Sequence, residues 1–447
     1  MTEQIQSGPI SLPNLPTSPP RPWLRLRDLE ELELYEEERN AAGEREDLDR
    51  WLALIPKIPS LRPYRASFRA VDDYFQEVEL EGEELHLWRA YKEVIMQRLT
   101  GVYDDILHLT DIILQDLFYF FVRHERLQGV KSRYTKRVVP LTFLGRSEDY
   151  YYTYAGDQAL PVVVVSIPQS RVGSVWNWLA IPHEVGHHIL AHFPGYEEEL
   201  LSAVATALRP LRLKVTQRHY PYGISNKALL ATIWYFWLEE MVADLFGILF
   251  TGPAHVMARQ EDALRLVESG IPVHSSTLDV KQTGMSRYPT TYVRGLFQTE
   301  TLRYLGFADW ADSLDRRWRK RFGRQDQLYW FDDSAAPFGD RTPLLSVPTV
   351  EMLRAFRAML PAMIDTPVAA FGGNRLLDLI RYDADDHERV LRVAEGLLNG
   401  TTKFGRKDRA RHILAASRFA FEREPGQQES IHELAVEAIK YCEQWVK

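Results

Sequence analysis

The chain has 447 residues, of which 45% are apolar and 26% charged, as expected for a globular protein with two or three structural units. Its formal net charge is −8 and its Lys and Arg residues are scattered, which argues against a nucleic-acid groove or an anionic-membrane surface. Cys442 is the single cysteine, so the sequence offers neither a disulfide framework nor a thiolate metal site.

The same features predict a cytoplasmic protein without a membrane partner. The first residues have neither the basic nor the apolar region of a secretory signal. The longest strongly apolar run, 229–238, has about half of the roughly 20 residues that a membrane span requires. The lack of disulfide chemistry fits the reducing cytosol.

In chain order, the first predicted segment is a disordered tail at 1–23, because its many prolines prevent a packed core. Residues 24–135 are predicted to form a helical region. Apolar residues recur at spacings of three and four in 85–99 and in 104–122, which indicates two amphipathic helices.

The pattern changes in the next region, 136–345. Runs of β-branched or aromatic residues at 138–144, 150–155 and 161–168 are separated by Gly, Asp and Pro, which predicts three short strands. We expect these strands to form one small sheet.

Helical periodicity returns at 173–193 and 226–250, and 287–307 combines a turn with a helix. The last region, 346–447, is helical in pattern almost throughout and ends in an amphipathic segment at 429–446. The predicted fold class is α+β and predominantly helical, with a small sheet in the central region and helical regions on both sides.

A histidine-rich motif, HEVGH, occupies residues 183–187. Its histidines, His183 and His187, are one helical turn apart, so both imidazoles can reach one cation. Glu184 lies about 100° around the helix from His183, close enough to contact a water on that cation. Gly186 leaves room beside the site. The motif predicts a zinc site, and the alternative is a polar helix surface.

Two further histidines follow the motif. His188 and His192 are also one turn apart, but Ile189 stands where a catalytic carboxylate would be needed. The third histidine of a metzincin site belongs ten residues after the first, and Phe193 occupies that position. We therefore expect His188 and His192 to belong to a polar helix face or to support a ligand, and not to bind the metal.

A catalytic zinc site needs a third protein ligand. The segment 238–250 places Glu240 and Asp244 one turn apart on an otherwise apolar helix. Buried carboxylates are costly unless they are paired or bind a metal. Glu240 is the candidate third ligand, and Asp244 can accept a hydrogen bond from the outer N–H of a ligand histidine. The alternative is a solvated edge of an amphipathic helix.

HEVGH followed by EMVADLFG at 240–247 resembles the gluzincin zinc metallopeptidases, the thermolysin-like clan. The resemblance covers about residues 160–250. The roles that it implies are Zn²⁺ ligand for His183, His187 and Glu240, catalytic carboxylate for Glu184, and partner of a ligand histidine for Asp244.

The resemblance also implies a zincin-like core with an edge strand that binds an extended substrate, and 161–168 lies in the position of that strand. This chain departs from the compact members by a longer insertion between the two motifs. It also has no recognisable copy of the segment that stabilises the oxyanion of the transition state. Tyr288, Tyr292 and Arg294 are the candidates for that role, and each is at least as well explained as a structural residue.

Asp104, His108 and Asp111 share a face of the helix predicted at 104–122. A metal site of the helix-bundle type would need a Glu-x-x-His pair beside them, and none is present. We expect a solvated face.

Together these features predict a zinc-dependent metallopeptidase in which Glu184 is the general base. The expected substrate is a protein or peptide, and the flanking helical regions predict restricted access and therefore selectivity. A regulatory protein partner is compatible with this function. Two alternatives stay open: a regulatory or binding protein on a retained zincin scaffold, and a zinc hydrolase of a non-peptide bond.

Overall fold

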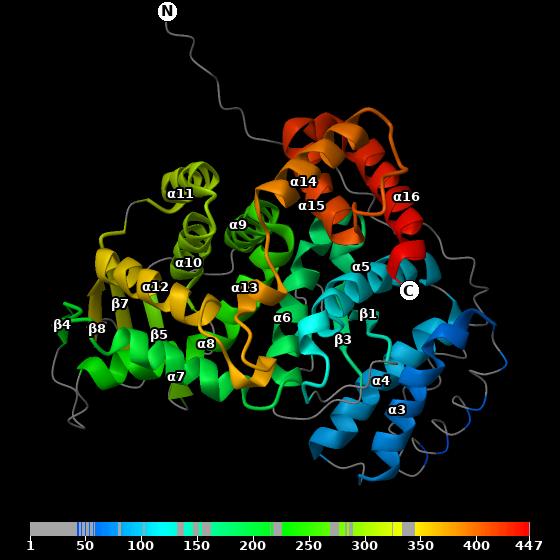
Figure 1. Cartoon of the computed structure of the whole chain (residues 1–447), viewed down its shortest axis with the longest axis horizontal. Coiled ribbons are helices and arrows are strands. Elements are labelled where there is room, and N and C mark those ends of the chain that lie inside the picture. Colours follow the sequence, from blue (N-terminus) through cyan, green and yellow to red (C-terminus); the bar gives the residue numbers. More distant parts are fainter. Residues whose placement is uncertain are drawn as a thin grey trace, which may run out of the picture.

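The computed structural model describes most of the chain from Pro59 to Val446 (Figure 1). The gaps in this range are 79–81, 102, 132–137, 146–151, 154–161, 215, 218–225, 269–276, 282–283, 286–288, 324 and 333–344. Before Pro59 only a few single positions are described, so the tail predicted at 1–23 lies outside the described residues. Of the helices that are described, none is long and apolar enough to cross a lipid bilayer.

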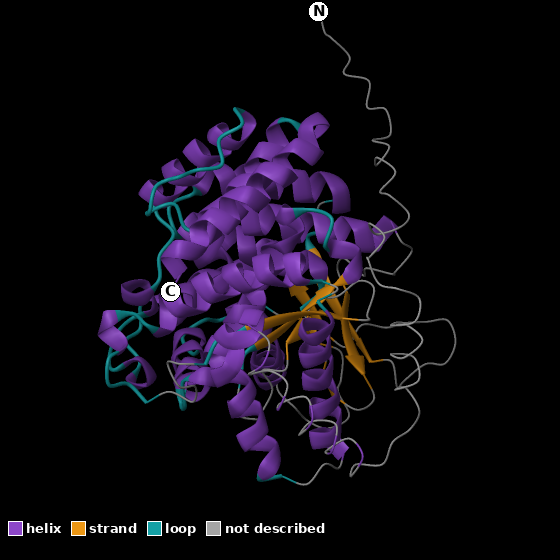
Figure 2. Ribbon diagram, turned by 90° about the vertical axis from the view of Figure 1, so that its right-hand side faces the viewer, coloured by secondary structure: helices purple, strands orange, loops and turns teal. Residues whose placement is uncertain are grey.

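The first part of the described chain is helical. It comprises the 3-10 helix η3 (Pro59–Tyr64) and the helices α3 (Arg65–Gln76), α4 (Gly82–Thr100) and α5 (Asp104–Val122). α4 and α5 confirm the two helices predicted from apolar spacing. Figure 2 shows helices above and below the strands, and the described residues confirm a predominantly helical α+β class.

The solvated face predicted for α5 is wrong at Asp111. This side chain is 1% exposed and lies 2.9 and 2.8 Å from the Arg98 guanidinium through its two oxygens. It also accepts a hydrogen bond from the backbone N–H of Thr142, at 2.7 Å. The arginine comes from the preceding helix and neutralises the carboxylate, which is why Asp111 can be buried. Asp104 is exposed and His108 partly exposed, as expected.

The first sheet has the order β1-β3-β2 and consists of β1 (Leu141–Gly145), β2 (Tyr152–Thr153) and β3 (Val164–Pro168). β2 and β3 fall within the predicted runs, and β1 overlaps the first run but ends one residue beyond it. β3 pairs with β1 in parallel and with β2 in antiparallel direction. The edge strand expected at 161–168 is therefore wrong, because β3 is central and fully buried. Its continuous apolar sequence suits a strand covered on both faces.

The structure also contains a second sheet, which the sequence patterns did not predict. Its order is β4-β8-β7-β5-β6. The strands are β4 (Thr216–Gln217), β5 (Thr277–Lys281), β6 (Gly284–Met285), β7 (Gln327–Asp332) and β8 (Leu345–Pro348).

The helices between and around the sheets carry both sequence motifs. They are η6 (Val175–Ala180), α6 (Ile181–His192), α7 (Tyr196–Leu208), α8 (Asn226–Thr251), α9 (Pro253–Glu268), α10 (Thr291–Tyr304) and α11 (Ala308–Phe322). Short 3-10 turns lie at η4 (Glu125–Leu127) and η5 (Gln169–Arg171). α6 and α8 pack against each other, and Figure 1 shows both near the centre of the molecule.

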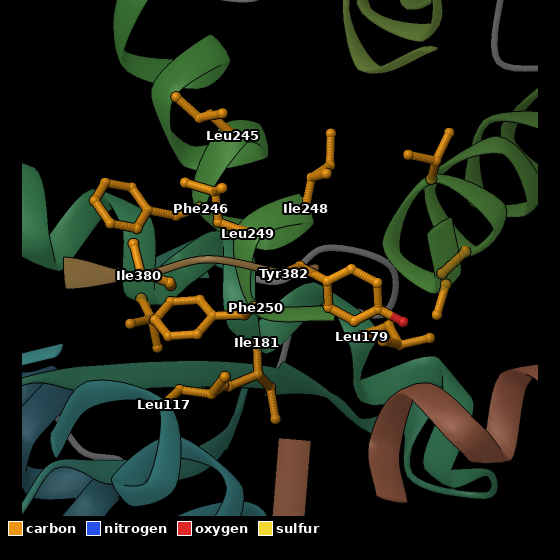
Figure 3. Close-up of a cluster of buried hydrophobic side chains, with 14 of the residues drawn as sticks. Leu117, Leu179, Ile181, Leu245, Phe246, Ile248, Leu249, Phe250, Ile380 and Tyr382 are labelled. Carbon is orange, nitrogen blue, oxygen red and sulfur yellow. The ribbon is translucent and has the colours of Figure 1, made fainter. Parts of the chain in front are cut away.

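The C-terminal helices cover this centre. They are α12 (Thr349–Ile364), η7 (Ala369–Phe371), α13 (Leu376–Leu379), α14 (Ala384–Leu398), α15 (Ala410–Arg423), η8 (Pro425–Gln427) and α16 (Gln428–Val446). α15 packs against α5, α8 and α9. Figure 3 shows buried side chains of α5, η6, α6 and α8 meeting Ile380 and Tyr382 of the C-terminal region. One hydrophobic cluster therefore runs from α5 to α16, and a smaller one joins α3, α4 and the first sheet.

Candidate metal centre

α6 and α8 are in close backbone contact at Gly186. A Cβ atom there would lie 2.8 Å from the Cα of Ala243 and 3.0 Å from the Cβ of Phe246. These distances leave no space for a side chain, so the backbone of α8 rests directly on α6. The contact places the second sequence motif against the first.

The three expected metal ligands converge between these helices. The Nε2 atoms of His183 and His187 are 3.2 Å apart. The Glu240 carboxylate is 3.5 Å from each of them, through Oε2 and Oε1 respectively. Ligands on the corners of a tetrahedron with usual Zn–N and Zn–O lengths are about 3.3–3.4 Å apart. The donor types and their spacing thus fit a zinc ion with one position left for a further ligand.

Glu184 follows His183 on α6 and is 5% exposed. Its carboxylate makes no hydrogen bond or ion pair with any other residue that the structure describes. A buried carboxylate beside two histidines and without a protein partner is free to contact a water or a substrate.

Asp244 lies one turn beyond Glu240 and is completely buried. Its Oδ1 is 2.9 Å from Nδ1 of His183, which is the contact expected for a residue that orients a ligand histidine. The contact assigns the proton to Nδ1 and leaves Nε2 available for a metal.

Arg294 of α10 reaches the same carboxylate. Its Nε and Nη2 lie 2.6 and 2.8 Å from the two Asp244 oxygens, and Nη2 is 3.0 Å from Glu240 Oε2. Burial alone would raise the pKa of both carboxyls, but the Arg294 charge and hydrogen bonding to His183 hold these pKa values well below their usual range. Of the candidates for oxyanion stabilisation, Arg294 is thus placed within the site.

Tyr292, the tyrosine candidate that the structure describes, lies elsewhere. Tyr292 is completely buried, and its hydroxyl accepts a hydrogen bond from the backbone N–H of Gln325 at 3.4 Å. Its side chain therefore belongs to the buried core near the C-terminal end of α11. Tyr288 lies outside the described residues.

Glu239 contacts the second histidine of the motif. Its Oε1 is 3.1 Å from Nδ1 of His187, and its side chain is 38% exposed. Burial alone would lower the pKa of His187, but the hydrogen bond to Glu239 and the charges of Glu240 and Glu184 raise this pKa to about 9. Sequence reasoning missed Glu239, although the pair of adjacent glutamates at the start of the second motif was a usable signal.

His188 and His192 are both buried, so the polar helix face expected for them is absent. His188 Nε2 is 3.2 Å from the backbone carbonyl oxygen of Val164 on β3. Burial lowers the pKa of His188 to about 3, which keeps the ring neutral. The ring of His192 packs edge-on against Phe118 of α5, with centroids 5.6 Å apart. The two rings thus join α6 to the sheet and to α5.

His255 of α9 extends the network beyond the expected residues. It is completely buried, with Nδ1 3.1 Å from a backbone carbonyl oxygen of η6 and Nε2 3.7 Å from Asp244 Oδ1. A Cβ at Gly247 would lie 2.4 Å from this ring, so the glycine of the second motif makes room for it. His183, Asp244 and His255 could hold a cation, but the Arg294 guanidinium on Asp244 opposes a second positive charge there.

The chain was compared with models of protein families, with curated proteins and with solved structures, and none of the three comparisons gave a match.

Proposed function

We propose that this chain is a zinc-dependent metallopeptidase of the gluzincin type with a zincin-like core. One observation carries the proposal. Two histidine nitrogens and a carboxylate are spaced like the corners of a zinc tetrahedron. Beside them lies Glu184, a buried carboxylate without a hydrogen-bond or ion-pair partner among the described residues.

His183, His187 and Glu240 would hold the metal, a His₂Glu set that is typical of catalytic zinc. A bound zinc ion supplies a Lewis acid that lowers the pKa of water and polarises a carbonyl group. Asp244 and Glu239 hold the two imidazoles by their outer nitrogens, which fixes the orientation of both rings.

Glu184 supplies the proton transfer that peptide hydrolysis requires. Its carboxylate takes a proton from the attacking water and delivers it to the nitrogen of the leaving amine. It has no partner among the described residues that would compete for this proton.

The proposed substrate is a protein or peptide, and the helices packed around α6 and α8 favour selective cleavage. A cytoplasmic location and a regulatory protein partner belong to the same proposal. Hydrolysis of a non-peptide bond would use the same residues and remains a variant of this function.

A second candidate function is favoured by the contact between Arg294 and Glu240. A fixed guanidinium against a metal ligand is also what a retained scaffold without metal would contain, as in a regulatory or binding protein. Metal binding by the wild-type chain decides between the two.

A digest of a peptide library tests the proposed activity. Zinc-loaded wild-type protein should cleave it, and Glu184→Gln should bind zinc normally but lose about 10²–10⁴-fold in rate, because proton transfer is lost. Glu198→Gln, on the exposed side of α7, is the matched control and should cleave like wild type. Equal cleavage by Glu184→Gln and wild type would remove Glu184 from the mechanism.

A further inference from the structure

The site concentrates negative charge in the interior. Glu184, Glu240 and Asp244 are 5, 8 and 0% exposed, respectively. Carboxylates buried side by side repel one another and cost free energy unless a cation neutralises them. Among the arginine and lysine side chains that the structure describes, Arg294 alone contacts any of these three.

Two residues of α10, one helical turn apart, donate hydrogen bonds to Asp244. Arg294 donates to both Asp244 oxygens, and Gln298 donates to Oδ2 at 2.8 Å. Because His183 contacts Oδ1 as well, each oxygen of the carboxylate has two partners. This carboxylate cannot rotate without breaking several of these contacts, so the orientation of His183 depends on α10.

The position of α10 is itself determined by close packing. A Cβ at Gly295, the residue after Arg294, would lie 2.6 Å from Nε1 of Trp318 on α11. The indole N–H also points to the backbone carbonyl oxygen of Tyr292, at 3.4 Å. The guanidinium is therefore carried by a helix that is firmly placed against its neighbour.

We propose that Arg294 is a built-in counter-ion that holds the metal ligands in place before a metal binds. The inference rests on the proposed function for the identity of the metal. The contacts of Arg294 with Glu240 and Asp244 join α10 to α8, and its Nη2 also lies 3.3 Å from the ring nitrogens of His183 on α6. Arg294 is thus a positioning residue that acts through Asp244 and Glu240.

This role predicts an unequal effect on the two states of the protein. In the metal-free chain, Arg294 supplies a permanent positive charge against Glu240 and Asp244. In the metal-loaded chain, a divalent ion supplies much of the same neutralisation. Loss of Arg294 should therefore harm the metal-free protein more than the loaded one.

Thermal unfolding of Arg294→Gln with and without zinc tests this. The metal-free variant should unfold about 5–10 °C below metal-free wild type, because a buried charge pair loses one partner. The difference should be less than half as large with saturating zinc. Equal losses in both states would overturn the proposal. Arg303→Gln is the control. Arg303 lies on the same helix but pairs with Glu300, Asp312 and Asp315, none of which is a proposed metal ligand, so the unfolding temperature of the variant should fall equally with and without zinc.

A double variant separates this inference from the proposed function. In metal-free protein, Arg294→Gln/Glu240→Gln should recover at least half of the lost unfolding temperature, since one of the two carboxylates that Arg294 neutralised no longer carries a charge. This comparison needs no metal, so it stands even if wild type binds no zinc, a result that would contradict the proposed function alone. If Arg294→Gln is insoluble, a soluble double variant supports the proposal and an insoluble one overturns it.

Discussion

A Cβ atom added to Gly186 of α6 would come within 2.8 Å of the Ala243 Cα on α8. The two proposed metal-binding motifs meet because the backbone of one helix contacts the backbone of the other. Gly186→Ala should therefore separate the helices, lower the free energy of unfolding by about 1–3 kcal/mol and weaken zinc binding. Urea unfolding and competition with a zinc chelator measure the two effects.

Gly173 provides a matched control, because nothing lies within 4 Å of a Cβ added there. Gly173→Ala should leave both the free energy of unfolding and the zinc affinity unchanged. Wild-type zinc affinity in Gly186→Ala would show that the close approach of the helices is not what assembles the site.

The two proposed ligand histidines, His183 and His187, have unequal supporting contacts. Asp244 holds His183 from a completely buried position, whereas Glu239 holds His187 with a side chain that is 38% exposed. Asp244→Asn should weaken zinc affinity by about 10–100-fold. Glu239→Gln should weaken it less, because water can replace a partly exposed carboxylate. Competition with a zinc chelator measures the zinc affinity of each variant. A larger loss in Glu239→Gln than in Asp244→Asn would contradict the stronger supporting role given to Asp244.

The resemblance of the two motifs to gluzincins was sufficient to select the residues that converge. His183, His187, Glu240 and Asp244 are each one turn apart within their own helix, so local spacing predicts which pairs share a face. Arg294 could only be named as a candidate, because its contact with Asp244 joins segments 50 residues apart. Sequence spacing carries no information about such a contact.

The fold was predictable where a segment is long and periodic. The predicted helix at 104–122 coincides with α5, whereas the second sheet was missed. Its strands have two to six residues, and β4 pairs with β8 across more than a hundred residues of chain. The face of α5 was misread for a similar reason, since the partner that buries Asp111 lies on another helix.

Acid should weaken the contact between α9 and the C-terminal helices. Burial would raise the pKa of Glu261, but the charges of Arg418 and Arg265 hold it below its usual value. A lowered pKa in the folded state adds stability above the pKa of the unfolded chain, and that stability is lost as the pH falls. The difference in unfolding free energy between wild type and Glu261→Gln should therefore shrink from pH 6 to pH 3.5.

Glu437 serves as the control for this titration, because it is 61% exposed and pairs only with Lys440 among the residues described. Glu437→Gln should differ little from wild type at either pH. If the difference in unfolding free energy between wild type and Glu261→Gln is constant across this pH range, the pKa of Glu261 does not differ between the folded and the unfolded chain.

Removal of residues 346–447 should give insoluble or inactive protein. These residues cover apolar side chains of the centre: Phe421 stacks on Trp176 of η6 at 4.4 Å, and His432 accepts the backbone N–H of Val175. Deletion of 1–20 is the comparison, since this Pro-rich composition buries little. Both deletion variants are assayed for solubility and peptidase activity. A soluble, active fragment ending near 345 would contradict the expectation.

The most direct test of the central claim is the position of the metal. An anomalous difference map measured at the zinc absorption edge, from crystals of zinc-loaded protein, locates the ion without reference to activity. The account predicts one peak per chain, about 2.0–2.2 Å from His183 Nε2, His187 Nε2 and a Glu240 oxygen. A map without a peak there, or with the ion held by Asp244 and His255 instead, would contradict it.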